Sequence, residues 1–221
     1  MKEPYFTTET IAQRAREMLE LVRSLRERHP FDFRPERAAL LVLDMQRYFL
    51  EEASHASIPS ARAVLPKIEE LIVAFAKRGR PVILTRHINT KEDAGQMGKW
   101  WRELIREEDP LSELIPGLFP GNGLIIEKGQ YDAFYKTPLE ELLRGEGVEQ
   151  LAISGVMTHL CCETTARAAF VRGFKVFFVI DGTATYNADF HRATLLNLAH
   201  GFAHPVLAEE LIAALGRRES G

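Results

Sequence analysis

The chain has 221 residues, of which 46% are hydrophobic and 27% are charged. These fractions are typical of a soluble globular protein and exclude a disordered or fibrous chain. The formal net charge is −3, so no basic excess indicates binding to nucleic acid or to an anionic membrane. The two cysteines, Cys161 and Cys162, are adjacent and cannot link distant segments, which excludes a disulfide-stabilised scaffold.

The N-terminal sequence has no apolar segment of the kind found in secretory signal peptides, and its glutamates argue against a transit peptide. The longest apolar run, at 176–180, is far shorter than the roughly 20 residues that cross a bilayer. We therefore expect a cytoplasmic protein, in a compartment where thiols stay reduced.

Residues 8–29 form a predicted amphipathic helix that ends before Pro30. Its apolar residues recur at alternating spacings of four and three and are Ile11, Ala15, Met18, Val22 and Leu25. This apolar stripe must be covered either by the core of the same chain or by a partner. Amphipathicity alone does not decide between the two.

From residue 38 onward, short apolar strands alternate with helices. The predicted strands are residues 38–43, 81–85, 123–127, 150–154, 175–180 and a short one near 205–207. The predicted helices are residues 61–77, 138–143, 161–171, 191–201 and 209–215. This alternation predicts an α/β fold with a mainly parallel sheet and helices on both faces. We expect one domain at 37–221, preceded by an N-terminal helical extension at 1–36.

Reactive side chains follow several predicted strands. Asp44 ends the first strand, Lys128 follows the third, and Cys161 follows the fourth at a predicted helix start. Ligands of open parallel sheets bind beyond the carboxyl ends of the strands. A thiol, a carboxylate that can take its proton and an ammonium that pairs with the carboxylate are the parts of a nucleophilic site.

The position of Cys161 predicts a lowered thiol pKa, because a helix dipole and the Lys128 ammonium both favour the thiolate. The alternative is that Cys161 is a small buried hydrophobic residue, as most free cysteines are. Convergence of three titratable residue types at one sheet edge favours the catalytic interpretation. The next residue points about 100° away on a helix, so we expect Cys162 to pack in the core.

Three segments resemble the signature segments of the isochorismatase-like cysteine hydrolase superfamily. They are LDMQRYF at 43–49, EKGQYDAF at 127–134 and GVMTHLC at 155–161. They occur in the order and spacing of that family, and DGTA at 181–184 matches the turn after its fifth strand. The resemblance covers residues 37–210 and implies a three-layer αβα sandwich with a Rossmann-like sheet.

The resemblance also implies roles for the matching residues. Asp44 would be the general acid and base, Lys128 would orient and polarise the site, and Cys161 would be the nucleophile. A cis peptide bond would join Val156 to Met157, and the N–H groups of Met157 and Cys161 would hold the substrate oxyanion. The resemblance further implies a homo-oligomer, either a dimer or a tetramer.

Two branches of the superfamily differ from this chain. The nicotinamidase branch has a zinc site built from Asp-x-His and a second histidine, whereas this chain has Arg86, His87 and Asn89 in that region and no second histidine close behind. We therefore expect no metal and no other cofactor, and nicotinamide is disfavoured. The isochorismatase branch has glycine at the position of Cys161. Vinyl ether hydrolysis needs no thiol, so Cys161 favours cleavage of a C–N bond.

The sequence thus predicts a hydrolase that cleaves the C–N bond of a small amide or ureido substrate through a thioester on Cys161. The alternative is an isochorismatase, which converts isochorismate to a dihydroxybenzoate precursor and pyruvate. The intact set of Asp44, Lys128 and Cys161 disfavours a non-catalytic interaction module. The strain of a vicinal disulfide disfavours a redox role for the cysteine pair.

Candidate substrate-binding residues lie near the same sheet edge and are Phe49, Arg86, His87, Trp100, Tyr131 and Phe134. The Arg86-His87 pair can bind a substrate carboxylate or lie on a solvated loop. Residues 100, 101, 104 and 105 have helical spacing, and adjacent helical positions diverge by about 100°, so only one of the two tryptophans can face the pocket. The other aromatic candidates also fit ordinary core packing.

Overall fold

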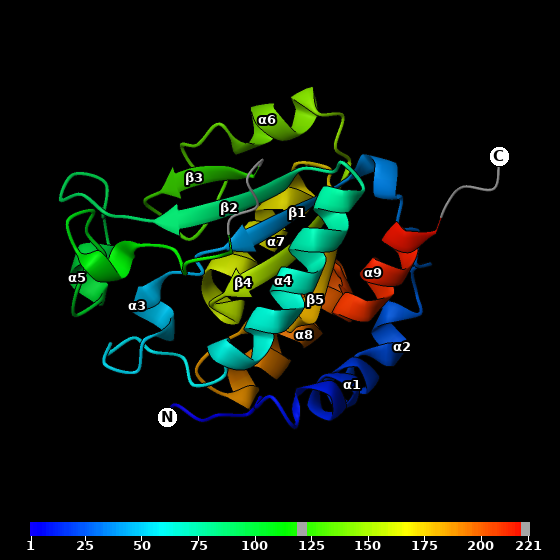
Figure 1. Ribbon diagram of the computed structural model, residues 1–221, viewed down its shortest axis with the longest axis horizontal. Helices are drawn as coiled ribbons and strands as arrows, with labels where there is room; N and C mark the ends of the chain where they lie inside the picture. Colours follow the sequence, from blue (N-terminus) through cyan, green and yellow to red (C-terminus); the bar gives the residue numbers. More distant parts are fainter. Residues whose placement is uncertain (119–122, 218–221) are drawn as a thin grey trace.

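A computed structural model describes residues 1–118 and 123–217. In this part of the chain six strands form one parallel sheet in the order β3-β2-β1-β4-β5-β6 (Figure 1). They are β1 (Ala38–Leu43), β2 (Val82–His87), β3 (Leu124–Lys128), β4 (Gln150–Val156), β5 (Lys175–Ala184) and β6 (His204–Val206). This order is that of doubly wound Rossmann sheets, so the predicted α/β fold class is confirmed.

Helices cover both faces of the sheet. One layer contains α4 and α9, which contact each other and β5, and the other contains α7 and α8 (Figure 1). The α-helices are α1 (Ile11–Leu21), α2 (Arg23–Arg26), α3 (Arg47–Leu50), α4 (Ala61–Lys77), α5 (Met97–Trp100), α6 (Leu139–Gly145), α7 (Glu163–Val171), α8 (Ala188–Gly201) and α9 (Ala208–Gly216). Shorter helical turns are η1 (Pro35–Arg37), η2 (Pro110–Ser112) and the π-helical η3 (Thr158–Cys162).

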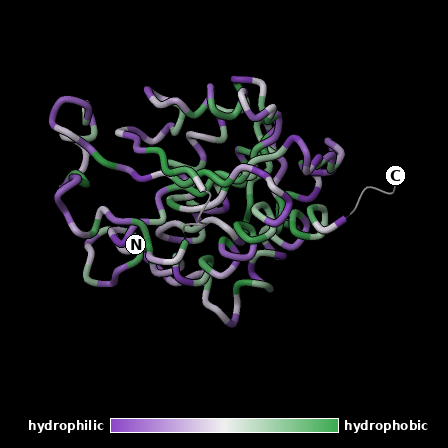
Figure 2. The backbone as a smooth tube through the Cα atoms, turned by 45° about the horizontal axis from the view of Figure 1, so that its top comes forward, coloured by the Kyte–Doolittle hydropathy of each residue, from purple (hydrophilic) through white to green (hydrophobic). Residues whose placement is uncertain are grey.

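The central strands are buried along their whole length, because helices cover both of their faces. Every residue of β1 and of β4 is buried, and Figure 2 shows hydrophobic backbone in the interior with hydrophilic segments around it. The two strands approach closely at Gly155, where a Cβ atom would lie 2.1 Å from the carbonyl oxygen of Leu43 and φ is +106°. Only glycine fits there, and this contact brings the end of β4 next to Asp44.

The N-terminal stripe packs on its own chain. Ile11, Ala15, Met18 and Val22 are buried, and α1 contacts β5 and α8. This answers the open question of what covers the stripe. The predicted single helix is interrupted at Val22, where φ is −106° and ψ is 5°, so α1 and α2 are separate. The N-terminal extension shares the main hydrophobic core with the rest of the chain. A domain boundary at residue 36 therefore stays a prediction.

Two further predicted elements differ from the structure. The strand predicted at 175–180 continues to Ala184, because its pairing with β4 resumes at Gly155 and Val156 after a register shift. The helical spacing at 100–105 does not form a long helix. Only α5 forms, and the chain turns extended at Trp101, since this polar segment has no sustained apolar stripe to bury.

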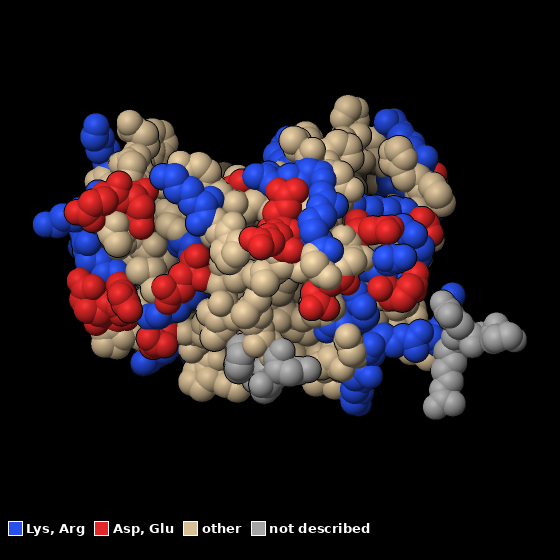
Figure 3. Space-filling view, turned by 90° about the horizontal axis from the view of Figure 1, so that it is seen from above, with Lys and Arg blue, Asp and Glu red and all other residues tan. Residues whose placement is uncertain are grey.

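Charged side chains of both signs are interspersed over the face shown in Figure 3, and Lys and Arg do not gather in a stripe there. None of the helices within 1–118 and 123–217 has the length and apolar composition needed to cross a bilayer.

Candidate active site

The three predicted catalytic side chains meet at the carboxyl edge of the sheet. Asp44 follows β1, Lys128 ends β3, and Cys161 lies in η3 directly after β4. The Lys128 Nζ atom is 2.7 Å from Asp44 Oδ2 and 3.4 Å from Cys161 Sγ. Parallel strands deliver these groups to one edge, as the sequence indicated. We call Asp44, His87, Lys128 and Cys161 the floor of the site.

The orientation of the Asp44 carboxylate is fixed by the neighbouring strand. Thr85 on β2 donates a hydrogen bond from Oγ1 to Asp44 Oδ1 at 2.6 Å, and the Asp44 N–H donates to the Thr85 carbonyl at 3.2 Å. The φ angle of Asp44 is 51°, in the left-handed region that aspartate tolerates better than most residues. One carboxylate oxygen is therefore held by Thr85 and the other faces Lys128.

The floor carries a charged pair inside the protein. The side chains of Lys128 and Asp44 are both fully buried. Burial favours the neutral amine, but the Asp44 carboxylate and Cys161 outweigh it and raise the Lys128 pKa above its usual value. The Gln130 carbonyl accepts a further hydrogen bond from Nζ at 3.0 Å. Lys128 is thus an ammonium ion with its protons directed at acceptors.

The prediction of a lowered Cys161 pKa is wrong. Burial, and next the nearby Asp44 carboxylate, raise the pKa of the thiol, and Lys128 only partly opposes them. Cys161 is 6% exposed and lies within the π-helical turn η3 rather than at the first residue of an α-helix. In the resting state it is therefore a thiol.

The neighbouring segments agree with the expectations drawn from the sequence. The peptide bond between Val156 and Met157 is cis. The Met157 carbonyl accepts hydrogen bonds from the N–H groups of Leu160 and Cys162 at 3.1 and 3.2 Å, which winds the chain into η3. Cys162 is fully buried in the hydrophobic core, so its predicted packing role is confirmed. Both cysteines are free.

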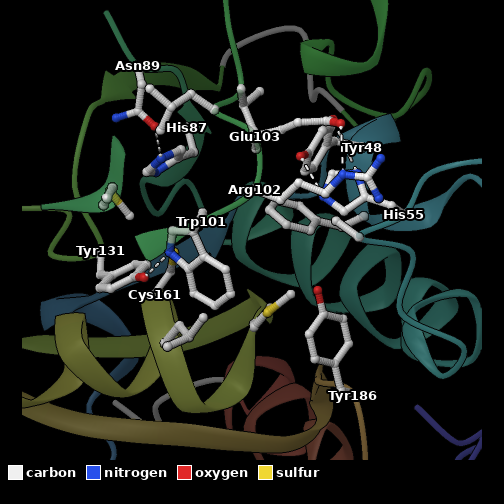
Figure 4. Close-up of a pocket in the computed structure, with 17 residues that line it drawn as sticks. Tyr48, His55, His87, Asn89, Trp101, Arg102, Glu103, Tyr131, Cys161 and Tyr186 are labelled. Atoms are coloured by element: carbon white, nitrogen blue, oxygen red, sulfur yellow. Dashed lines mark hydrogen bonds and ion pairs between the residues drawn. The ribbon is translucent and has the colours of Figure 1, made fainter. Parts of the chain in front are cut away.

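A cavity of about 170 Å³ opens above the floor, with Cys161 and His87 among its lining residues (Figure 4). Its wall is largely apolar, and its aromatic members are Tyr48, Phe49, Trp101, Tyr131 and Tyr186. The Trp101 Nε1–H donates to the Tyr131 hydroxyl at 2.6 Å. We call the outer residues His55, Trp101, Arg102, Glu103 and Tyr186 the rim.

Three of the six candidate substrate-binding residues line this cavity, namely Phe49, His87 and Tyr131. Arg86 does not. Its guanidinium pairs with Glu113 at 2.7 Å and with Glu127 at 3.1 Å. These ion pairs link β2 to β3 and to the loop that precedes β3.

Trp100 and Phe134 also lie outside the cavity lining. Trp100 is 79% exposed, and it is Trp101 that lines the cavity, because the backbone turns extended directly after α5. Phe134 is buried, stacks on Phe174 with a centroid distance of 5.9 Å and lies under the Arg172 guanidinium. Phe134 therefore packs in the hydrophobic core and not in the cavity lining.

Sequence reasoning missed several residues of the site. Thr85 was only the last residue of a predicted strand, although a polar side chain on a buried strand beside Asp44 was a usable signal. Asn89 follows His87 by two residues, the strand period, so both fall on one side of the chain. Tyr186 gave no signal, because it lies beyond the part of β5 that was predicted.

The N-terminal segment reaches this cavity. Lys2 donates from Nζ to the His55 carbonyl and lies over the Tyr186 ring, 4.6 Å from its centroid. The Glu3 N–H donates to the Tyr186 carbonyl at 2.8 Å. Two rim residues that are far apart in sequence are therefore held by the same short segment.

The floor does not fit a resident metal ion. Asp44, His87 and Cys161 bring potential ligand atoms within 4.8 Å of one another. However, the Lys128 ammonium contacts all three donors, at 2.7 Å from Asp44, 3.3 Å from His87 and 3.4 Å from Cys161. A second cation among the same donors would be repelled by it.

Known proteins share both this sequence and this fold. The family model of the isochorismatase domain matches residues 38–210. Nicotinamidase 3 of Arabidopsis thaliana is 42% identical over 179 residues, which cover 79% of this chain and 86% of that protein. Enterobactin synthase component B of Escherichia coli (strain K12) is 32% identical over 185 residues, which cover 82% of this chain but only 65% of that protein.

The structure of a cysteine hydrolase from Pseudomonas syringae pv. phaseolicola 1448A aligns with a TM-score of 0.81 at 28% identity, covering 84% of this chain and 95% of that one. The match to the family model spans the whole sheet and every residue of the floor. The chain therefore belongs to the isochorismatase family of hydrolases.

Proposed function

We propose that the protein hydrolyses the C–N bond of a small amide or ureido substrate, with Cys161 as the nucleophile. The observation that carries this proposal is the contact of the Cys161 thiol with the Asp44–Lys128 pair at the bottom of an aromatic cavity. A buried thiol with a raised pKa needs a base within reach, and Asp44 is that base.

The reaction has two halves. Asp44 takes the thiol proton while Sγ attacks the carbonyl carbon, and the N–H groups of Met157 and Cys161 hold the oxyanion. The tetrahedral intermediate collapses, Asp44 returns the proton to the leaving nitrogen, and ammonia or an amine departs from a thioester. Asp44 then takes a proton from water, which attacks the thioester, and the carboxylic acid leaves as the thiol reforms.

Lys128 supports both halves because it stays positively charged. Its ammonium lies within hydrogen-bonding distance of both Asp44 and Cys161. Negative charge moves between these two groups during each proton transfer, and a fixed cation stabilises it on either one. Such a cation is already in place before the reaction, so little reorganisation is needed.

The cavity favours a planar, uncharged substrate. Its wall offers aromatic faces for stacking, and its rim carries the opposite charges of Arg102 and Glu103. The sequence-based argument against nicotinamide rested on missing zinc ligands and not on the pocket. The aromatic wall and the similarity to Nicotinamidase 3 both favour an aromatic carboxamide, and nicotinamide therefore comes first among the compounds to assay.

Isochorismatase activity is the second candidate, and the similarity to enterobactin synthase component B favours it. Isochorismate carries two carboxylates, and an anionic ligand is held best by cations that face it. Arg102 is 79% exposed and pairs with Glu103 at 3.6 Å, which offsets its charge. The cavity therefore suits a neutral amide better than a dianion.

A substrate panel with two matched cysteine variants tests the proposal. Wild type, Cys161→Ala and Cys162→Ala are assayed for ammonia release from nicotinamide, other aromatic and aliphatic carboxamides and ureido acids, and for pyruvate release from isochorismate. We expect amide turnover by wild type and Cys162→Ala and a loss of at least ~10³-fold in Cys161→Ala. Undiminished turnover by Cys161→Ala, or pyruvate release alone, would overturn it.

A further inference from the structure

His87 lies in the floor with both ring nitrogens engaged. Its Nε2 atom is 2.9 Å from Asn89 Oδ1, and its Nδ1 atom is 3.3 Å from Lys128 Nζ (Figure 4 shows the Asn89 contact). The side chain is 5% exposed. No ring nitrogen remains to bind a substrate carboxylate, which was one of the roles expected for His87. Its neighbours point to a different role.

The contacts of Asn89 fix the tautomer of His87. The Asn89 Nδ2 atom donates to the Gly129 carbonyl at 2.7 Å, so the oxygen of the same amide faces the imidazole. An amide oxygen only accepts, and Nε2 must therefore carry the hydrogen. In a neutral imidazole the other nitrogen is then an acceptor. Nδ1 accordingly presents a lone pair to the Lys128 ammonium.

The imidazole is neutral in the folded protein. Burial, and next the Lys128 ammonium, lower the pKa of His87 to about 4. The other ionisable groups that face it are Asp44 after β1, Asp93 in the loop after β2 and Cys161 in η3. At neutral pH the ring is therefore an acceptor beside an ammonium and not a second cation.

Four acceptors surround the three protons of Lys128. They are Asp44 Oδ2 at 2.7 Å, the Gln130 carbonyl at 3.0 Å, His87 Nδ1 at 3.3 Å and Cys161 Sγ at 3.4 Å. Asp44 and Cys161 change protonation in the reaction, whereas Gln130 and His87 do not. Gln130 and His87 thus hold the ammonium in place while Asp44 and Cys161 exchange a proton.

We propose that Asn89 and His87 are positioning residues that hold the Lys128 ammonium between Asp44 and Cys161 and thereby set the reactivity of the Cys161 thiol. Asn89 fixes the tautomer, His87 presents its lone pair, and Lys128 carries the effect to the thiol. The inference rests on the proposed function in taking Cys161 as the nucleophile.

The test measures thiol reactivity directly, without a substrate. Full-length wild type, His87→Leu, His87→Asn and Asn89→Leu are alkylated with iodoacetamide from pH 5 to 10, and mass spectrometry follows the peptide that contains Cys161. Leucine has no acceptor, whereas the Oδ1 of an asparagine at 87 lies near the place of the imidazole Nδ1. The Cys161→Ala variant supplies the background, and unfolding temperatures show that each variant is folded.

We expect His87→Leu to slow alkylation about 10-fold at each pH of this range, which is the effect of losing one hydrogen bond to a charged group. His87→Asn should stay within about threefold of wild type, and Asn89→Leu should fall between the two. A role in packing alone predicts instead that His87→Leu alkylates like wild type, or that His87→Asn falls as far as His87→Leu. Either result overturns the proposal.

The steady-state kinetics separate this inference from the proposed function. With an amide that wild type hydrolyses, His87→Leu should lower kcat and leave KM within about twofold, because His87 acts through Lys128 and not on the substrate. A raised KM with unchanged kcat would contradict the inference. If wild type hydrolysed no amide, the proposed function would fail, while the alkylation rates would still decide the role of His87.

Discussion

The floor and the rim of the cavity are built in opposite ways. The floor side chains are almost fully buried and lie at the ends of strands or in the turn that follows one. The rim side chains lie in loops, with Trp101 37% exposed and Glu103 50% exposed. Under the proposed function this difference separates two tasks, because reacting groups need a rigid frame whereas substrate contacts can vary on loops without disturbing it.

Breaking the charged pair of the floor should have the largest effect. Lys128→Met leaves Asp44 buried without its partner, which costs about 3–5 kcal/mol of unfolding free energy, and it should abolish amide turnover. In the double variant with Asp44→Asn, no buried charge remains and asparagine tolerates the left-handed φ of this position. Urea unfolding should show that the double variant recovers most of the lost stability and none of the activity.

A double variant no more stable than Lys128→Met would contradict this account of the floor. The expected pattern, with stability regained and turnover still absent, would show that the charged pair serves the reaction and not the fold.

A buried histidine that belongs neither to the floor nor to the cavity lining should affect stability alone. Burial lowers the His191 pKa from 6.5 to about 3, so the unfolded chain takes up a proton below pH 6.5 and the folded chain does so only near pH 3. Its contribution is complete above pH 6.5 and is lost on acidification, by up to ~1.4 kcal/mol per pH unit. The Asp181 carboxyl, whose pKa burial raises to about 6, opposes this loss.

The His191→Asn variant isolates the contribution of His191, because Asp181 and His87 are common to both proteins. Asparagine keeps an acceptor for the Tyr5 hydroxyl, which lies 2.8 Å from His191 Nδ1. Between pH 6.5 and 4.5 the variant should lose less unfolding free energy than wild type, with the same kcat at pH 7. Equal losses in the two proteins would show that His191 is protonated in the folded state.

The two adjacent tryptophans give a matched pair for the rim. Trp101 lines the cavity and donates to Tyr131, whereas Trp100 is exposed. Trp101→Ala should raise KM for an aromatic amide about 10-fold with kcat within about threefold, since it removes a stacking surface and the hydrogen bond that positions Tyr131. Trp100→Ala should leave both parameters unchanged. Equal effects of the two substitutions would remove Trp101 from the binding surface.

The N-terminal contact with the rim should have the smallest effect. Lys2→Ala removes a cation over the Tyr186 ring and a hydrogen bond to the His55 carbonyl. We expect KM to rise about two- to threefold, in line with an exposed cation–π contact. Lys136→Ala is the matched control, because Lys136 lies over the Tyr135 ring at 5.3 Å, outside the cavity lining. A KM change of equal size in the control would contradict the assignment.

The floor was predictable from sequence and the rim was not, for physical reasons. Asp44, Lys128 and Cys161 each follow an apolar strand, and the geometry of a parallel sheet brings strand ends together wherever the connections run. Trp101 faces the cavity because its backbone is extended directly after the short helix α5. The spacing of apolar residues in the sequence does not reveal such a local change of conformation. The pKa of Cys161 was misjudged because sequence gave the Lys128 partner but not the extent of burial.

Partitioning with hydroxylamine is the most direct test of a covalent intermediate on Cys161. Two amides that share an acyl group but release different amines, such as nicotinamide and its N-methyl amide, are hydrolysed in the presence of hydroxylamine. A common thioester predicts the same ratio of hydroxamate to acid from both amides, with neither product formed by Cys161→Ala. Acid as the sole product, or a ratio that changes with the leaving amine, would contradict nucleophilic catalysis by Cys161.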